Sequence, residues 1–234
     1  MKFRVGIENN NDGIRSLAWA LEHPGCFVYG ENAQKALSAL PAAIRTYSLW
    51  ISQHEPTWLQ AENVDLEVES VFDDYSIDQN FERVPGGNGH YAVDSWYQYD
   101  WKPLDAEDIE RGLKLLAWSR ADLLRTIEDV PPSKMSLARP GERWTSINGI
   151  LSHVGGAEWW YMDSLGKAFP KSQVPKEPLK RLEKVRAALI SLLPKLEGVE
   201  LVRGSQGEFW SPRKVLRRAV WHERDHTAHI RKLL

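Results

Sequence analysis

The chain ends in SPRKVLRRAVWHERDHTAHIRKLL, residues 211–234, which carries the strongest local fold signal in the sequence. Ser211 before Pro212 is typical of a helix N-cap followed by proline at the first helical position. A stripe with the 4-3-4-3-4 spacing of a buried helix face then follows: Val215, Ala219, His222, His226, His229 and Leu233. The stretch therefore predicts a helix whose buried stripe contains three histidines.

Three further segments before this helix show helical spacing of apolar residues. The first begins near residue 105 and ends before the proline pair at 131–132. The second begins at Thr145 or Ser146, and the third spans residues 175–196. In the second of these segments, Ile150, His153, Ala157 and Trp160 share one face. Four helices with one apolar stripe each predict a four-helix bundle over residues 105–234, with His153 in its interior.

The first half of the chain has a different pattern. Residues 1–8, 16–21 and 26–29 read as short strands separated by turns, a helix starts at Asn32, and residues 64–71 alternate apolar and acidic side chains as a fourth strand does. This βββαβ order predicts a small α+β domain over residues 1–72. Residues 73–104, rich in turn formers, acids and aromatics, are predicted to be a linker or lid. The predicted fold class is therefore α+β, with an all-α second domain.

Composition excludes several classes of protein. The formal net charge of −2 argues against a general nucleic-acid binder, although residues 61–110 carry a local charge of −12 and residues 171–234 one of +8. No apolar run approaches the roughly 18 residues of a membrane span, and the N-terminus does not read as a signal peptide, so we expect a cytoplasmic protein without a membrane partner. Cys26 is the only cysteine, so any metal must be held by nitrogen and oxygen.

The histidines are the candidate metal ligands. A single histidine in a helix stripe is commonly a hydrogen-bonded core residue, but several buried imidazoles on facing helices each need a partner. His153, His222 and His226 are therefore predicted to hold a divalent metal with open positions for substrate, as catalytic sites do. Three imidazoles suit zinc, nickel, copper or iron, with zinc and nickel placed first. His229, about 10 Å along the helix axis from His222, is assigned to the rim.

The segment HERDH also fits the H-E-x-x-H pattern of zinc proteases. Only eight residues follow His226, and His229 and Lys232 stand where the extended pattern needs a glycine and a third histidine. We therefore expect the third ligand upstream, at His153. Glu223, about 100° around the helix from His222, is predicted to point away from the stripe, and its place in the motif is interpreted as coincidence.

The segments WTSINGILSHVGGAEWWYMDSLG and VWHERDHTAHIRKLL resemble the DinB family of metal-binding four-helix bundles. Trp144 and Thr145 lead to His153, and His222 and His226 match the family's H-x-x-x-H, while Thr227, Ala228 and His229 replace its Arg-Gly-Gln. The resemblance implies the same three metal ligands, frequent homodimers, and activity as a transferase or isomerase that uses a low-molecular-weight thiol such as mycothiol, bacillithiol or glutathione.

The segment ALEHPGCFVYGENAQKALSALPAAI, within residues 1–72, resembles the HicB-like domain. That resemblance implies a small protein partner, but the DNA-binding element that HicB proteins add at the C-terminus is not recognisable in this sequence.

Three hypotheses about function follow. The first is a metal-dependent enzyme that joins a low-molecular-weight thiol to a small-molecule substrate. The second is a metal-dependent hydrolase with Glu158 or His229 as its base. The third is a non-enzymatic module in which the HicB-like half binds a protein and the bundle carries a structural metal.

Overall fold

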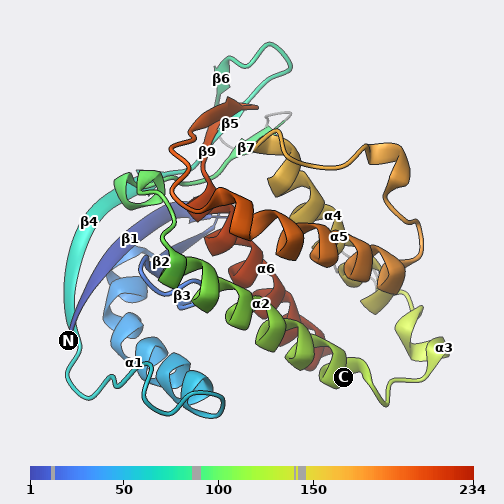
Figure 1. Ribbon diagram of the computed structural model, residues 1–234, viewed down its shortest axis with the longest axis horizontal. Helices are drawn as coiled ribbons and strands as arrows, with labels where there is room; N and C mark the ends of the chain where they lie inside the picture. The colour runs from blue at the N-terminus through green and yellow to red at the C-terminus, as the bar shows by residue number, and fades with distance from the viewer. Residues whose placement is uncertain (12–13, 86–90, 140, 142–145) are drawn as a thin grey trace. The chain divides into compact units, whose positions relative to one another are not determined.

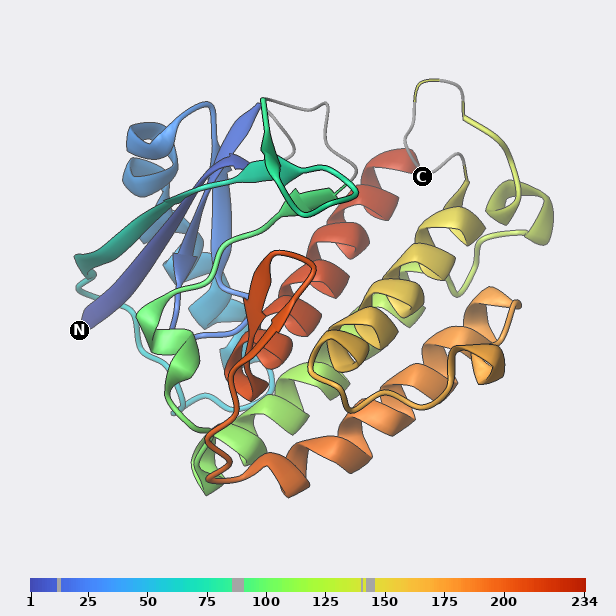
Figure 2. The same cartoon turned by 90° about the horizontal axis from the view of Figure 1, so that it is seen from above.

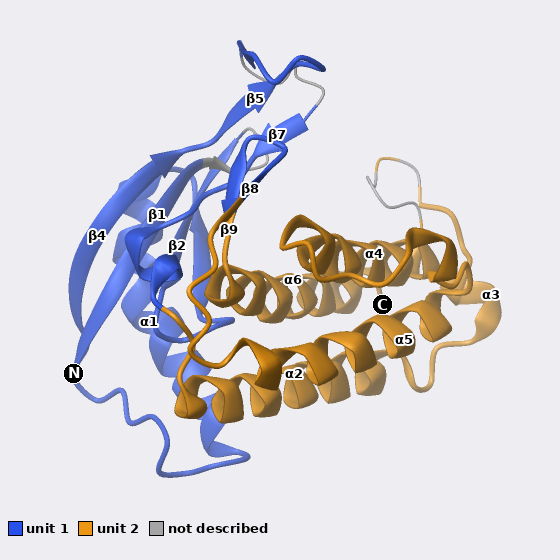
Figure 3. Ribbon diagram, turned by 45° about the horizontal axis from the view of Figure 1, so that its top comes forward, with its two compact units in different colours: residues 1–102, 204–209 blue, residues 103–203, 210–234 orange. Residues whose placement is uncertain are grey.

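The computed structural model describes residues 1–11, 14–85, 91–139, 141 and 146–234. The chain is mixed α and β, with a small sheet near the N-terminus followed by helices, which confirms the predicted order. It divides into two compact units (Figure 3). Unit 1 comprises Met1–Lys102 and Gly204–Phe209, and unit 2 comprises Pro103–Arg203 and Trp210–Leu234.

Unit 1 contains a four-stranded sheet with the order β3-β2-β1-β4 (Figure 1). β1 pairs with β2 in antiparallel and with β4 in parallel orientation, and α1 connects β3 to β4. The βββαβ order predicted for this half is therefore present. The bounds are β1 Lys2–Asn11, β2 Arg15–Ala20, β3 Phe27–Gly30, α1 Ala33–Ser52 and β4 Asp65–Asp73.

Helix α1 begins where the sequence predicts. The Asn32 side chain accepts a hydrogen bond from the backbone N–H of Lys35 at 2.9 Å, which is an N-cap. Pro41 lies inside α1, and the helix continues beyond it to Ser52. One face of the helix is buried at intervals of three or four residues, as a helix over a sheet requires: Ala36, Leu40, Ile44, Tyr47 and Ile51.

The segment predicted as a linker or lid contains a second sheet. Its order is β6-β5-β7, and a short 3-10 helix, η1 Gln98–Trp101, follows it. The aromatic side chains here are packed rather than free, since the ring of Trp96 lies 4.6 Å from that of Phe72 and 5.2 Å from that of Phe209. The strands are β5 Tyr75–Ile77, β6 Arg83–Val84 and β7 Tyr91–Val93.

Unit 2 is built from four long helices that run alongside one another (Figure 2). α2 packs on α6, α6 on α4, and α4 on α5. Their apolar core at one end consists of Leu123, Ile127, Ile147, Ile150, Leu151, Val154, Leu182 and Ile230. The helices are α2 Ala106–Ile127, the short α3 Pro132–Met135, α4 Ile147–Ser164, α5 Pro178–Leu192 and α6 Pro212–Leu233.

Side chains cap all four long helices. Ser146 and Ser211, both expected from the sequence, accept hydrogen bonds from backbone N–H groups in the first turns of α4 and α6. Asp105 forms a capping box with Asp108 at the start of α2, and Glu177 caps α5. Between α5 and α6 lie η3 Leu193–Leu196 and the hairpin β8 Arg203–Ser205 and β9 Glu208–Trp210. Within the described residues, every helix is too short or too polar to span a bilayer.

Candidate metal centre

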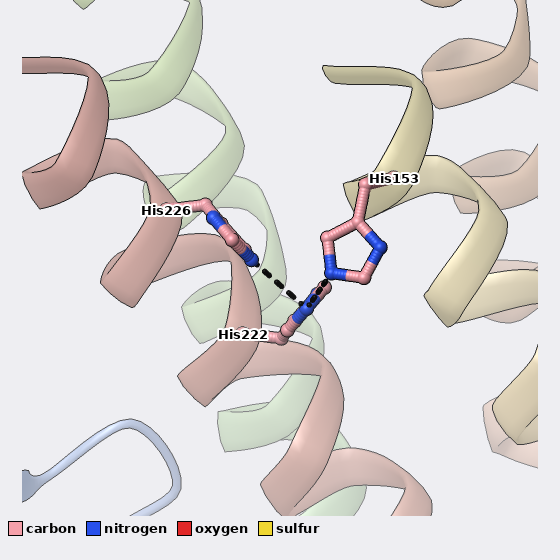
Figure 4. Close-up of side chains that lie close together, drawn as sticks. All are labelled: His153, His222 and His226. Atoms are coloured by element: carbon pink, nitrogen blue, oxygen red, sulfur yellow. Dashed lines mark hydrogen bonds between the residues drawn. The ribbon is translucent and has the colours of Figure 1, made fainter. Parts of the chain in front are cut away.

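Three histidine side chains from two helices of unit 2 point toward one another (Figure 4). His222 and His226 lie one turn apart on α6, and His153 lies on α4. The Nε2 atom of His222 is 2.9 Å from that of His153 and 3.1 Å from that of His226. The structure thus brings together the three residues that the sequence predicts.

These distances fit a shared metal better than hydrogen bonding alone. A ring nitrogen of imidazole has either one N–H or one lone pair, so Nε2 of His222 cannot form two linear hydrogen bonds at once. Two nitrogens on one ion, each about 2.0–2.1 Å from it with roughly 90–110° between them, lie about 2.9–3.4 Å apart. The two observed separations, 2.9 and 3.1 Å, fall in this range. The three histidines can therefore hold a metal ion.

The environment keeps His222 in the form that binds metals. Its side chain is buried, and burial lowers its pKa well below 6.5 because the charged imidazolium would lose its water. His226, His153 and Arg218 lower the pKa further because their positive charge opposes protonation. Since only the neutral imidazole coordinates a metal, His222 is ready to bind one at neutral pH.

No family model, curated protein or solved structure matches this chain. The resemblances to the DinB and HicB-like families therefore stay predictions. The chemistry of the centre has to be argued from its own side chains.

His229 lies beside the three histidines but outside their group. The His229 ring is half-buried, and its centroid lies 5.9 Å from that of His226. It is not among the three histidines whose ligand atoms lie within 4.8 Å of one another, in agreement with its assignment to the rim. Trp144 and Thr145, which the DinB resemblance uses, lie outside the described residues.

Aromatic side chains flank the three histidines. The ring of Tyr161 lies 6.1 Å from that of His222 and stacks on Trp210 at 5.3 Å, and Trp160 meets Trp210 edge-on at 5.0 Å. The ring of Trp221, the residue before His222, lies 5.5 Å from that of His222. Tyr161 and Trp210 are almost completely buried. Such an apolar surround limits the access of water and strengthens the electrostatic effect of a bound ion.

Glu223 is buried and bonded on the side of α6 that faces α2 and α5. Its carboxylate is fully buried between helices and accepts hydrogen bonds from Ser119 Oγ at 2.6 Å, Arg120 Nε at 2.6 Å and Arg186 Nη2 at 2.9 Å. Glu223 thus points away from the histidines, as predicted, and is no base of a zinc-protease motif. Its burial was not predicted: α6 is buried on all sides from Pro212 to Glu223, and not along the histidine stripe alone.

Burial and charge act in opposite directions on this carboxylate. Burial alone would raise the pKa of Glu223, but the charges of Arg186 and Arg120 and the hydrogen bond from Ser119 outweigh it and lower the pKa. Glu223 is therefore an ionised partner of two arginines and not a general base.

Glu158, the other carboxylate considered as a base, is similarly engaged. Arg186 donates to both of its oxygens, from Nε at 2.9 and 3.1 Å and from Nη2 at 2.7 Å. This contact between α4 and α5 was not predicted from the sequence. A usable signal was present, because Arg186 stands among the apolar positions of α5, between Leu182 and Leu189, where a charge requires a buried partner.

Two other features of the described residues are unlike the histidine group. Glu8, Asp74 and Asp94 of unit 1 have ligand atoms within 4.8 Å of one another, but buried Glu8 already accepts hydrogen bonds from Ser95 and Trp19. A groove of about 710 Å³ in unit 2 is lined by residues of α2, α3, α4 and α5, among them Leu124, Met135 and Asn148, and includes no histidine. Within the part of the chain that the structure describes, the histidine group alone combines convergent nitrogen donors with burial.

Proposed function

We propose that this protein is a metal-dependent enzyme that uses its three-histidine centre to transfer a low-molecular-weight thiol to a small electrophilic substrate or to isomerise its adduct. The observation that carries the proposal is the convergence of three ring nitrogens, two of the separations being 2.9 and 3.1 Å, in a buried setting. Three protein ligands are typical of catalytic rather than structural zinc sites, which have four.

A divalent ion held there would supply Lewis acidity, which lowers the pKa of a thiol that binds it. His153, His222 and His226 would hold the ion, and Tyr161, Trp210 and Trp221 would exclude water from one side. Zinc and nickel are the metals proposed first among the four, with copper and iron, that three imidazole donors suit.

The thiol has to come from a second molecule. Cys26 is the only cysteine of the chain, and its side chain is 1% exposed, so it is shielded from substrates. A nucleophilic sulfur at the centre therefore implies a small thiol as cosubstrate.

Hydrolysis is the rival use of the same centre. It needs a base beside the ion, and Glu158 and Glu223 are both occupied by Arg186. His229, with its ring 5.9 Å from that of His226, remains the only base candidate from our hypotheses, and it favours hydrolysis only if its substitution removes activity. The proposal that unit 1 docks a small protein partner rests on the HicB-like resemblance alone.

The test is a screen of the metal-loaded protein with glutathione, bacillithiol and mycothiol against generic electrophiles such as chlorodinitrobenzene. Thiol consumption that is lost in His226→Ala and kept in His54→Ala, which removes an exposed imidazole from unit 1, would support the proposal. Ester or amide cleavage without any thiol would favour the hydrolase. Metal binding without turnover under either condition would leave the non-enzymatic module as the better account.

A further inference from the structure

Arg186 connects the two helices that carry the histidines, although α5 itself contributes no ligand. The side chain is 5% exposed, and its guanidinium reaches Glu158 of α4 through Nε at 2.9 Å and Nη2 at 2.7 Å. The same Nη2 donates to Glu223 of α6 at 2.9 Å. Because guanidinium is planar and its donors have fixed directions, it sets the relative position of the two carboxylates.

Both carboxylates stand close to metal ligands along their helices. Glu223 directly follows His222 and precedes His226 by three residues, so it belongs to the same helical turn as both. Glu158 follows His153 by five residues, or about 7.5 Å along the axis of α4. A shift of either helix at its carboxylate would therefore move a ligand with it.

The remaining contacts tie the group to the other helices of unit 2. Ser119 and Arg120 of α2 donate to Glu223, Arg120 Nη1 donates to the carbonyl of Leu182 in α5 at 2.8 Å, and Arg186 Nη1 donates to that of Leu116. Two arginines thus face two glutamates, and the formal charges balance. We call Arg120, Glu158, Arg186 and Glu223 the interior ion network.

Stability alone is a weak reason for such a network, because well-packed apolar side chains of similar volume are often at least as stabilising as a buried ion pair. Directional contacts do what apolar packing does less well, which is to fix the register of one helix on another. A three-histidine centre divided between α4 and α6 needs that register held to a fraction of an ångström.

We propose that Arg186 is a positioning residue of the metal centre: by bridging Glu158 and Glu223 it sets the spacing of His153 from His222 and His226. The proposal rests on the metal binding proposed above. It also gives the glutamate of H-E-x-x-H a role, which is to anchor the ligand helix to the interior ion network.

The test removes the bridge without leaving an unbalanced charge. Glu158→Met with Arg186→Met takes out one charge of each sign and leaves Glu223 with Arg120 and Ser119. Arg186→Lys is the second variant, because it keeps the charge but an ammonium cannot reproduce the planar fork. Lys180→Gln with Glu183→Gln, on the exposed face of α5, removes the same charges elsewhere and is the matched control.

Two measurements are made on each variant that unfolds cooperatively. The first is the dissociation constant for Zn²⁺, together with the visible spectrum of the Co²⁺ form. The second uses metal-free protein labelled at the histidine rings, in which nuclear Overhauser effects between the Hε1 protons of His153 and His222 report how close the rings are. If Arg186 only stabilised the fold, a variant that remains folded would keep both the wild-type metal affinity and the wild-type ring contacts.

We expect the double variant to bind Zn²⁺ roughly 10-fold to 100-fold more weakly, as substitutions behind metal ligands do, with a changed Co²⁺ spectrum and weaker ring contacts. Arg186→Lys should weaken Zn²⁺ binding and the ring contacts as well, but to a smaller extent. Wild-type affinity and wild-type ring contacts in whichever of the two variants folds would overturn the proposal. If wild type itself binds no metal, the proposed function fails, and the ring contacts alone still decide whether Arg186 positions the histidines.

Discussion

The carboxylate of Glu223 offers the sharpest stability prediction. In Glu223→Gln the side chain keeps its shape but has one acceptor oxygen and one NH₂ group that only donates. One carboxylate oxygen of Glu223 receives Arg120, and the other receives Ser119 and Arg186. Whichever way the amide turns, its NH₂ group therefore faces an arginine donor, and the two arginines are left with a single buried carboxylate, that of Glu158.

The magnitude follows from burial. Glu223 is 0% exposed and Arg186 4% exposed, so water cannot take over the lost contact. Removing one partner of a buried ion pair typically costs about 3–5 kcal/mol, and we expect the free energy of unfolding to fall by that amount. For a chain of this length the melting temperature should fall by roughly 6–20 °C.

The assay is guanidinium denaturation of metal-free protein followed by circular dichroism at 222 nm. The matched control is Glu110→Gln on α2, whose carboxylate pairs with Lys114 at the surface and should matter little. A loss below about 1 kcal/mol in Glu223→Gln, the ordinary effect of a point substitution, would refute the reasoning that Glu223 is a required buried anion.

The pH dependence supplies a second readout of the same carboxylate. Because the folded-state pKa of Glu223 lies below its ordinary value of 4.5, the unfolded chain binds more protons there as the pH falls. The stability contributed by this group should be fully present above about pH 4.5 and be lost as the pH falls through the folded-state pKa. Glu223→Gln should lack this component of acid denaturation. If the free energy of unfolding fell equally with pH in variant and wild type, Glu223 would not be the buried anion that we assign.

Three further predictions concern other parts of the molecule. His229→Ala should keep its metal content, since its ring lies outside the group of three, and loss of metal in elemental analysis would make it a ligand. The folded-state pKa of His222 is lowered, so the stability of metal-free protein should decline as the pH falls below about 6.5 in wild type and less steeply in His222→Ala, which denaturation at pH 5 and 7.5 would show. In Gly6→Ala the new Cβ would lie 2.6 Å from the ring of Tyr97, which is 1% exposed, and we expect a loss of about 1–3 kcal/mol. Gly204→Ala, with no atom within 4 Å of the new Cβ, is its control, and equal stability of the two variants would count against the close packing at Gly6.

Local signals predicted much of the fold. Asn32, Ser146 and Ser211 each start a helix because their side chains satisfy backbone N–H groups within the same few residues. The strands of the small second sheet and of the hairpin before α6 were harder, because runs of two or three residues show no periodicity and exist only through pairing.

The grouping of the three histidines could be predicted, whereas of the interior ion network only the buried position of Arg186 had a signal in the sequence. The spacing of His222 and His226 places both on one face of any helix, and His153 stood out in an otherwise apolar stripe. The burial of Glu223 was not predicted because the spacing indicates one buried stripe on α6, whereas both Glu223 and His222 are buried in the structure. Which helices surround α6 is a property of the tertiary packing, and no spacing within the helix encodes it.

The most direct test of the centre is metal content per chain, measured by elemental analysis on wild type, His226→Ala and His54→Ala after loading with Zn²⁺ or Ni²⁺ and removal of excess ion. We expect close to one ion per chain in wild type and in His54→Ala, and almost none in His226→Ala. Wild-type protein that folds but retains no ion after loading, or His226→Ala that retains as much as wild type, would contradict the assignment of His153, His222 and His226 as a metal centre.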